Sequence, residues 1–152
     1  MKVITLIQPW ATLVALGEKR IETRSWSTNF RGRIAIHAGK KVDRSVFEQP
    51  YYSEVFQRYS ITPDNIITSS IIATCMVGDV KRTEDLIDII SNQELAFGNY
   101  EPNRYGWILE DIILIIPIEG VKGMLGIWNY NDEKEGFPSR SHPPGNSLFF
   151  NR

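Results

Sequence analysis

The sequence predicts a single small α+β domain in which short helices flank a set of strands. Its 152 residues suit one domain, because chains of roughly 100 to 200 residues usually build one core. Hydrophobic residues make up 42% of the chain and charged residues 23%, which is typical of a globular protein and not of a disordered one. Short β-rich runs alternate with short helical patterns, which indicates the α+β class.

The strands are predicted from runs that are rich in β-branched residues or that alternate in polarity. Pro117 is expected to end one of them, because proline cannot donate to a β-ladder. The predicted strands are 3–7, 20–26, 33–38, 66–80, 105–116 and 126–128.

Three helical regions are predicted between these strands. Pro9 suits the first turn of a helix and Gly17 suits its end. The stretch 44–59 has a helical apolar stripe, and Pro50 divides it into two short helices or one broken helix. A further helix is expected from Thr83 to Ile90.

Residues 1–131 are predicted to form the domain, and residues 132–152 a C-terminal tail or arm. The arm contains Gly, Pro, Ser and charge without periodicity. Its apolar run 148–150 is expected to dock on the domain or on a second copy, which would give a homodimer.

Composition restricts the cofactors, the partners and the compartment. Cys75 is the only cysteine, which favours a cytoplasmic protein without disulfides, and its apolar surroundings predict a buried, unreactive thiol. Cys75, His37 and His142 lack metal-ligand spacing, so we expect no metal and no other cofactor. The N-terminal apolar stretch is too short to span a bilayer, so no membrane association is expected. The net charge of −1 favours no class of partner.

Two blocks of sequence carry a family resemblance. The string QPWATLVALGEKRIETRSW, followed by RGRIAIHAGKK, resembles the signature of the ASCH domain family through Gly17, Lys19, Glu22, Arg24 and the pair 31–32. The later block FGNYEPNRYGWILEDIILIIPIEGVKGMLGIWNY resembles the family's closing strands. The resemblance implies a PUA-like mixed β-barrel with short flanking helices, and a cleft that binds RNA or a nucleotide.

Basic and aromatic residues are interleaved in the first quarter of the chain. Cations bind phosphates and aromatic faces stack on bases, so this pattern suits single-stranded RNA. The alternative is that the cations are solvated and that Trp10 and Trp26 belong to the core. The cations are Lys19, Arg20, Arg24, Arg31, Arg33, Lys40 and Lys41, and the aromatic residues are Trp10, Trp26 and Phe30.

Glu22 and Arg24 lie two residues apart on a predicted strand and therefore on one face. Arg24 would offer a planar fork to a phosphate or a base edge, while Glu22 would orient it or accept from an exocyclic amine. The alternative is an internal salt bridge that braces the fold.

Lys19 is the candidate catalytic residue, because a partly desolvated lysine can act as a base. Family members that hydrolyse an acetylated cytidine resemble one another in a Lys, a Thr three residues later and a Glu on a later strand. Here Glu22 occupies the threonine position, Thr23 is displaced by one residue, and Met76 stands in place of the later Glu, although Asp79 could supply a carboxylate. Cleavage of RNA by Lys19 with Ser25 or Tyr105 is a further alternative.

The favoured function is an RNA- or nucleotide-binding ASCH domain protein linked to translation or transcription regulation, and the alternative is a small hydrolase. For His37, at a strand end, the functional interpretation is a proton shuttle or a base-stacking group, and the alternative is a structural histidine. Arg104 and Tyr105 form a second basic and aromatic group. The candidate binding residues are Trp10, Lys19, Glu22, Arg24, Ser25, Trp26, His37, Lys40, Arg104 and Tyr105.

Overall fold

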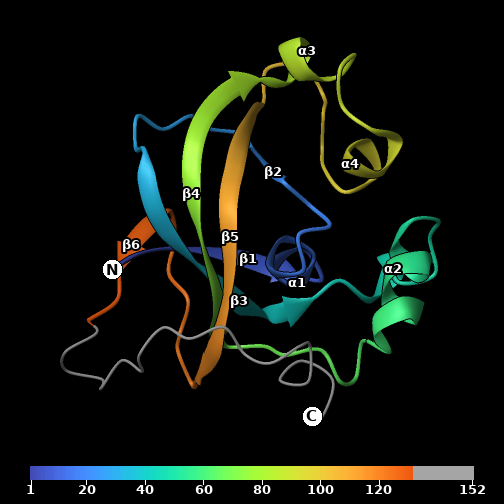
Figure 1. Ribbon diagram of the computed structural model, residues 1–152, viewed down its shortest axis with the longest axis vertical. Coiled ribbons are helices and arrows are strands. Elements are labelled where there is room, and N and C mark those ends of the chain that lie inside the picture. The colour runs from blue at the N-terminus through green and yellow to red at the C-terminus, as the bar shows by residue number, and fades with distance from the viewer. Residues whose placement is uncertain (132–152) are drawn as a thin grey trace.

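The computed structural model describes residues 1–131 and shows a curved mixed sheet with short helices beside it (Figure 1). The α+β class is therefore confirmed. The arm predicted for residues 132–152, and the dimer contact assigned to it, lie outside the described residues.

Six strands form the sheet in the order β2-β5-β4-β3-β1-β6. β1 pairs in parallel with β3, and the other neighbouring strands are antiparallel. Each strand falls on a run that the sequence predicted. The strands are β1 (Lys2–Gln8), β2 (Ile21–Arg24), β3 (Gly32–Val42), β4 (Ser70–Arg82), β5 (Tyr105–Glu119) and β6 (Ile127–Asn129).

The region around Pro50 forms two short helices, as predicted. A helix that the sequence analysis missed, α4, has Ser91 as its N-cap, whose side chain accepts a hydrogen bond from the Glu94 amide. None of the helices within residues 1–131 has the length and apolar character needed to cross a bilayer. The helices are α1 (Trp10–Ala15), a 3-10 helix (Arg44–Val46), α2 (Tyr52–Tyr59), α3 (Thr83–Leu86) and α4 (Asn92–Ala96).

The β-barrel that the resemblance implied is not supported in the described residues, because the sheet is open between β2 and β6. The outer edge of β2 is covered by side chains instead of by a strand. Lys19 Nζ donates to the Ile21 carbonyl at 2.5 Å, and Arg104 Nη2 lies 3.5 Å from the Thr23 carbonyl. These contacts satisfy the carbonyl groups that a further strand would otherwise bind.

The prediction that Pro117 ends the fifth strand is also wrong, because β5 continues to Glu119. β2 pairs with β5 only as far as Ile108, so the outer side of β5 has no neighbouring strand at Pro117. Pro117 also lies in an irregular stretch of the β4–β5 ladder, between the pairs Ile71–Ile118 and Ala73–Leu114, and a proline is tolerated at such a bulge.

The largest buried cluster lies between the sheet and α1, and a smaller one, which includes Val3, Ala35 and Trp128, lies on the other face. α1 packs on the core through Ala11, Leu13 and Val14, which are fully buried. Cys75 is buried in the largest cluster, and this burial raises the pKa of its thiol to about 12. The thiol therefore stays protonated, and the prediction of a buried structural cysteine is confirmed.

His37 lies buried on the other face of the sheet, where it links β1, β3 and β6. Its Nε2 donates to the Val121 carbonyl at 2.7 Å, so in the neutral ring Nδ1 accepts from the Thr5 hydroxyl at 3.1 Å. The Thr5 hydroxyl in turn accepts from Trp128 Nε1 at 3.1 Å. Burial lowers the pKa of His37, and the Val121 carbonyl opposes that shift.

We expect the unfolding free energy to fall as the pH drops below about 6.5, the ordinary pKa of histidine. The folded state binds a proton at His37 less readily than the unfolded chain, so acid favours unfolding through the window below 6.5 and down to the lowered pKa. Urea unfolding at pH 7.5, 6.5 and 5.5 measures this effect. His37→Gln, which removes the ionisable group, should lose less stability over the same range, and parallel losses in both proteins would contradict the assignment.

Candidate functional site

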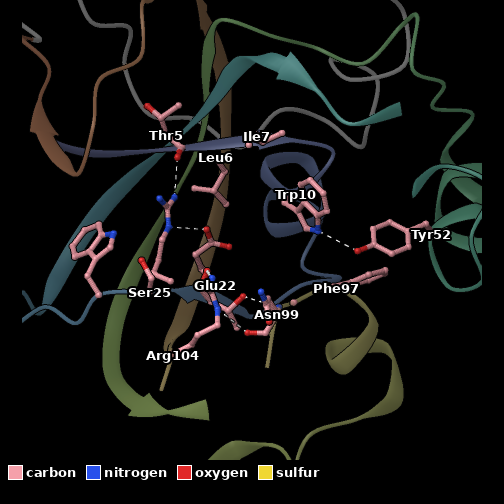
Figure 2. A pocket seen from close by; sticks show the side chains of 14 residues that line it. Thr5, Leu6, Ile7, Trp10, Glu22, Ser25, Tyr52, Phe97, Asn99 and Arg104 are labelled. Atoms are coloured by element: carbon pink, nitrogen blue, oxygen red, sulfur yellow. Dashed lines mark hydrogen bonds and ion pairs between the residues drawn. The ribbon is translucent and has the colours of Figure 1, made fainter. Parts of the chain in front are cut away.

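A cleft of about 500 Å³ opens where β1 and β2 approach the start of α1 (Figure 2). This volume lies within the range of small-ligand sites in proteins, roughly 300 to 1,000 Å³. Residues from β1, from β2 and the turn after it, from both helices α1 and α2, and from the segment before β5 meet here. They are Thr5, Leu6, Ile7, Trp10, Glu22, Thr23, Arg24, Ser25, Trp26, Tyr52, Phe97, Gly98, Asn99 and Arg104.

Glu22 and Arg24 form a fixed polar edge inside the cleft. Their positions two residues apart on β2 bring them to one face, where Arg24 Nε donates to Glu22 Oε2 at 2.9 Å. Arg24 Nη2 also donates to the Thr5 carbonyl at 2.8 Å, which ties β2 to β1. The internal salt bridge that the sequence allowed is therefore present, and it lies on the wall of the cleft.

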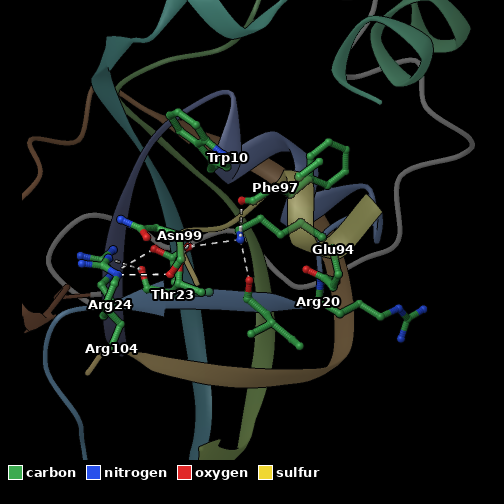
Figure 3. A network of polar contacts seen from close by, with 12 residues as sticks. Trp10, Arg20, Thr23, Arg24, Glu94, Phe97, Asn99 and Arg104 are labelled. Carbon is green, nitrogen blue, oxygen red and sulfur yellow. Dashed lines mark hydrogen bonds and ion pairs between the residues drawn. The ribbon is translucent and has the colours of Figure 1, made fainter. Parts of the chain in front are cut away.

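Lys19 lies behind this edge and is only 1% exposed. Its Nζ donates to the Ile21 carbonyl and, at 2.8 Å, to the Phe97 carbonyl, and it lies 3.8 Å from Glu22 Oε1 (Figure 3). Burial lowers the pKa of Lys19, while the carboxylates of Glu22 and Glu94 oppose this shift. The lysine thus joins β2 to the cleft wall at Phe97.

The segment before β5 supplies the opposite polar wall. The Asn99 amide donates to Thr23 Oγ1 at 2.9 Å, and Arg104 Nε donates to the Asn99 carbonyl at 3.2 Å. Within residues 1–131, Arg104 forms no ion pair with a carboxylate. Its positive charge is therefore available to an anionic ligand.

Aromatic side chains give the cleft its apolar surfaces. Trp10 Nε1 donates to the Tyr52 hydroxyl at 3.1 Å, and that hydroxyl donates to the Ala96 carbonyl at 2.8 Å. Trp26 packs edge-on against buried Trp107 with ring centroids 4.9 Å apart. Both Trp10 and Trp26 are half-buried, so each packs on the core and also lines the cleft.

The structure brings most of the predicted binding residues together but separates four of them from the cleft lining. Lys19 lies behind it, and His37 lies on the far face of the sheet. Tyr105 pairs with Arg24 across β5 and β2 without lining the cleft, and Lys40 is exposed near the end of β3. The predicted residues that line the cleft are Trp10, Glu22, Arg24, Ser25, Trp26 and Arg104.

The group of cations expected in the first quarter of the chain is dispersed by the fold. Arg31 lies 3.6 Å from Asp79, and Arg33 forms an ion pair with Asp111. Asp79, considered as a catalytic carboxylate, is exposed and lies outside the cleft lining. In the described part of the chain, His, Cys, Asp and Glu form no cluster of three or more that could hold a metal ion.

Sequence reasoning missed several contributors to the cleft, among them Thr5, Tyr52, Phe97 and Asn99. The backbone carbonyl of Thr5 accepts a hydrogen bond from Arg24, and that of Phe97 accepts one from Lys19. Because any residue has a backbone carbonyl, the identity of these two residues gave no signal of a role in the cleft. Tyr52 was expected only as part of a helical stretch. A signal for Asn99 was its place in the turn-rich run before Arg104.

Comparisons with known proteins agree with this architecture. The ASCH domain matches residues 4–122. Activating signal cointegrator 1 from Homo sapiens is 34% identical over 93 residues, which cover 60% of this chain and 15% of that protein, and the Mus musculus protein matches to the same extent. The chain thus spans about 15% of the length of these curated relatives.

Two solved structures share the fold. The crystal structure of ASCH from Zymomonas mobilis has a TM-score of 0.55 and 15% identity, covering 93% of this chain and 96% of that one. The crystal structure of a point mutant of the Zymomonas mobilis protein has a TM-score of 0.52 and 16% identity, covering 89% of this chain and 94% of that one. The fold is therefore PUA-like, and the match over residues 4–122 shows that this chain belongs to the ASCH domain family.

Proposed function

We propose that the cleft binds one nucleotide of a single-stranded RNA or a free nucleotide. The observation that carries this proposal is that two arginines, one glutamate and two tryptophans line a single cleft of about 500 Å³. The charged side chains in the lining sum to one excess positive charge, which suits a ligand with one bound phosphate. Membership of the ASCH family, whose PUA-like fold is associated with RNA binding, supports the same class of ligand.

Arg104 is the phosphate-binding residue in this proposal. Its guanidinium contacts the backbone carbonyls of Asn99 and Thr23, and these contacts orient the group without neutralising its charge. A phosphate oxygen would form a charge-assisted hydrogen bond with it.

Glu22 and Arg24 would contact the edge of the base. Because each already holds the other, their polar atoms are fixed before a ligand arrives, and little side-chain entropy is lost on binding. Glu22 can accept from an amino group of a base, and Arg24 can donate to a ring nitrogen or carbonyl.

Trp10 and Trp26 would provide the stacking surface. The Tyr52 hydroxyl holds the Trp10 indole, and Trp107 holds the Trp26 indole through an edge contact. Base stacking on an aromatic ring is worth about 1–3 kcal/mol per base and tolerates every base.

The geometry favours binding over catalysis by Lys19. Its Nζ already donates to two backbone carbonyls and is almost completely buried, so Lys19 acts as a positioning residue for the Phe97 wall. A regulatory role in transcription or translation is part of the proposal, supported by the similarity to Activating signal cointegrator 1.

Arg104→Gln should weaken binding of a labelled single-stranded RNA and make it less dependent on salt. Losing one phosphate contact should reduce the slope of log K against log salt by about 0.7. Fluorescence anisotropy titrations at several salt concentrations measure both quantities, and gel analysis of the same samples detects cleavage. Arg82→Gln is the matched control, since Arg82 is exposed, pairs with Glu84 and lies outside the cleft lining. Equal effects of the two substitutions would remove Arg104 from the site.

Lys19→Met should lower the unfolding free energy by about 2–4 kcal/mol, because it leaves buried carbonyl groups without their donor. Arg20→Met, which alters the adjacent exposed cation, should stay within about 0.5 kcal/mol of the wild type. Urea denaturation measures both variants. A Lys19→Met protein of unchanged stability that has lost a hydrolytic activity of the wild type would instead assign Lys19 a catalytic role.

A further inference from the structure

The outer edge of β1 is unpaired where it borders the cleft. β3 occupies one edge of β1, and β6 pairs with the other edge only from Lys2 to Ile4. Beyond Ile4 the outer edge therefore has no neighbouring strand, and the cleft opens beside it. In Figure 2, this part of β1 forms one rim of the cleft, with Ile7 between Thr5 and Trp10.

The backbone N–H and C=O of Ile7 point to this unpaired edge. The backbone groups of successive residues in a strand point alternately to its two edges. The Thr5 carbonyl points to the outer edge, where it accepts from Arg24, and the Gln8 carbonyl points to the edge of β3, where it accepts from the Asp43 amide at 2.7 Å. Ile7, two residues after Thr5 and one before Gln8, therefore presents both of its backbone groups to the cleft.

These two groups of Ile7 have no partner in the part of the chain that the structure describes. Among residues 1–131, neither a strand nor a side chain forms a hydrogen bond with them. Ile7 lines the cleft and is 43% exposed, so a ligand in the cleft can approach its backbone. A ligand that covers unpaired backbone groups loses affinity unless it replaces their hydrogen bonds to water. The ligand at this edge must therefore offer both an acceptor and a donor.

The edge of a nucleobase meets this requirement. Each base has a ring nitrogen beside an exocyclic oxygen or amino group, and proteins that bind single strands form hydrogen bonds with this Watson–Crick edge. An ionised phosphate offers acceptors alone and would leave the Ile7 carbonyl unpaired. The backbone of Ile7 thus suits the base, while Arg104 suits the phosphate.

We propose that the Ile7 N–H donates to an acceptor on the Watson–Crick edge of the bound base and that the Ile7 carbonyl accepts from a neighbouring N–H of the same base. This inference rests on the proposed function of the cleft and adds a requirement on its ligand, namely a base whose Watson–Crick edge is free. A base that is paired in a duplex cannot meet this requirement, so the site is restricted to unpaired nucleotides. Glu22 and Arg24 then contact the remaining polar atoms of the base from β2.

Amide hydrogen exchange, followed by NMR on the 15N-labelled protein, tests the contact of the Ile7 N–H. The ligands are the four nucleoside monophosphates, each at saturating concentration, and ribose 5-phosphate, which lacks a base. A bound monophosphate should slow exchange of the Ile7 amide by about tenfold or more, and ribose 5-phosphate should leave it unchanged. Leu125, which is 98% exposed and lies outside the cleft lining, is the internal control whose amide should exchange at one rate in all samples.

Replacement of Ile7 by its α-hydroxy acid analogue tests the effect on affinity, because the resulting ester keeps the side chain and lacks the N–H. Affinity for the monophosphates should fall about fivefold, as expected for the loss of one neutral hydrogen bond. The same replacement at Leu125 is the matched control and should leave the affinity unchanged. Urea denaturation shows whether each ester variant is folded, and the exchange measurement on the wild type decides the question if the Ile7 ester is not.

The outcomes separate this inference from the proposed function. If monophosphates bind the wild type without slowing the Ile7 amide, or bind a folded Ile7 ester as tightly as the wild type, the inference is wrong and the cleft remains a nucleotide site. Equal slowing by ribose 5-phosphate would show that Ile7 contacts the sugar or the phosphate, which would also overturn it. Failure of the wild type to bind any monophosphate or a single-stranded RNA pentanucleotide would reject the proposed function, and the inference would fall with it.

Discussion

The cleft depends on the contacts of the buried amino group of Lys19. A lysine is seldom as fully buried as Lys19, and burial is tolerated here because Nζ donates to two carbonyls and faces the carboxylate of Glu22. One carbonyl belongs to β2 and the other to Phe97, which is distant in sequence. The same group therefore covers the open edge of the sheet and holds the wall of the cleft against it.

A continuous chain of polar contacts extends from this lysine across the cleft. Lys19 faces Glu22, Glu22 accepts from Arg24, and Arg24 donates to the carbonyl of Thr5. The side chain of Thr5 then reaches His37 on the other face of the sheet. Each member is held by the next, so the polar edge is preorganised, which limits the entropy lost when a ligand binds. The contacts that stabilise the fold are for this reason the ones that shape the site.

Much of the fold could be predicted from the sequence, because strand runs and the break at Pro50 are local signals. Closure of the sheet could not, since it depends on whether the edge of β2 meets a strand or the side chains of Lys19 and Arg104. In the site, the spacing of Glu22 and Arg24 correctly placed both on one face. The burial of Lys19 was out of reach, because its partner at Phe97 is set by tertiary packing.

The pairing of charges explains how a chain with a net charge of −1 can still offer a cationic site. Among residues 1–131, most arginines outside the cleft pair with an acidic residue, often one far away in sequence, as Arg33 does with Asp111. Such pairs weaken the general attraction for polyanions, because a neutralised cation releases few counterions from RNA. The positive charge of Arg104 is not offset in this way, because the hydrogen-bond partners of its guanidinium are the backbone carbonyls of Asn99 and Thr23. In the proposed function, affinity would thus depend on a few cations at defined positions and not on nonspecific coating of a strand.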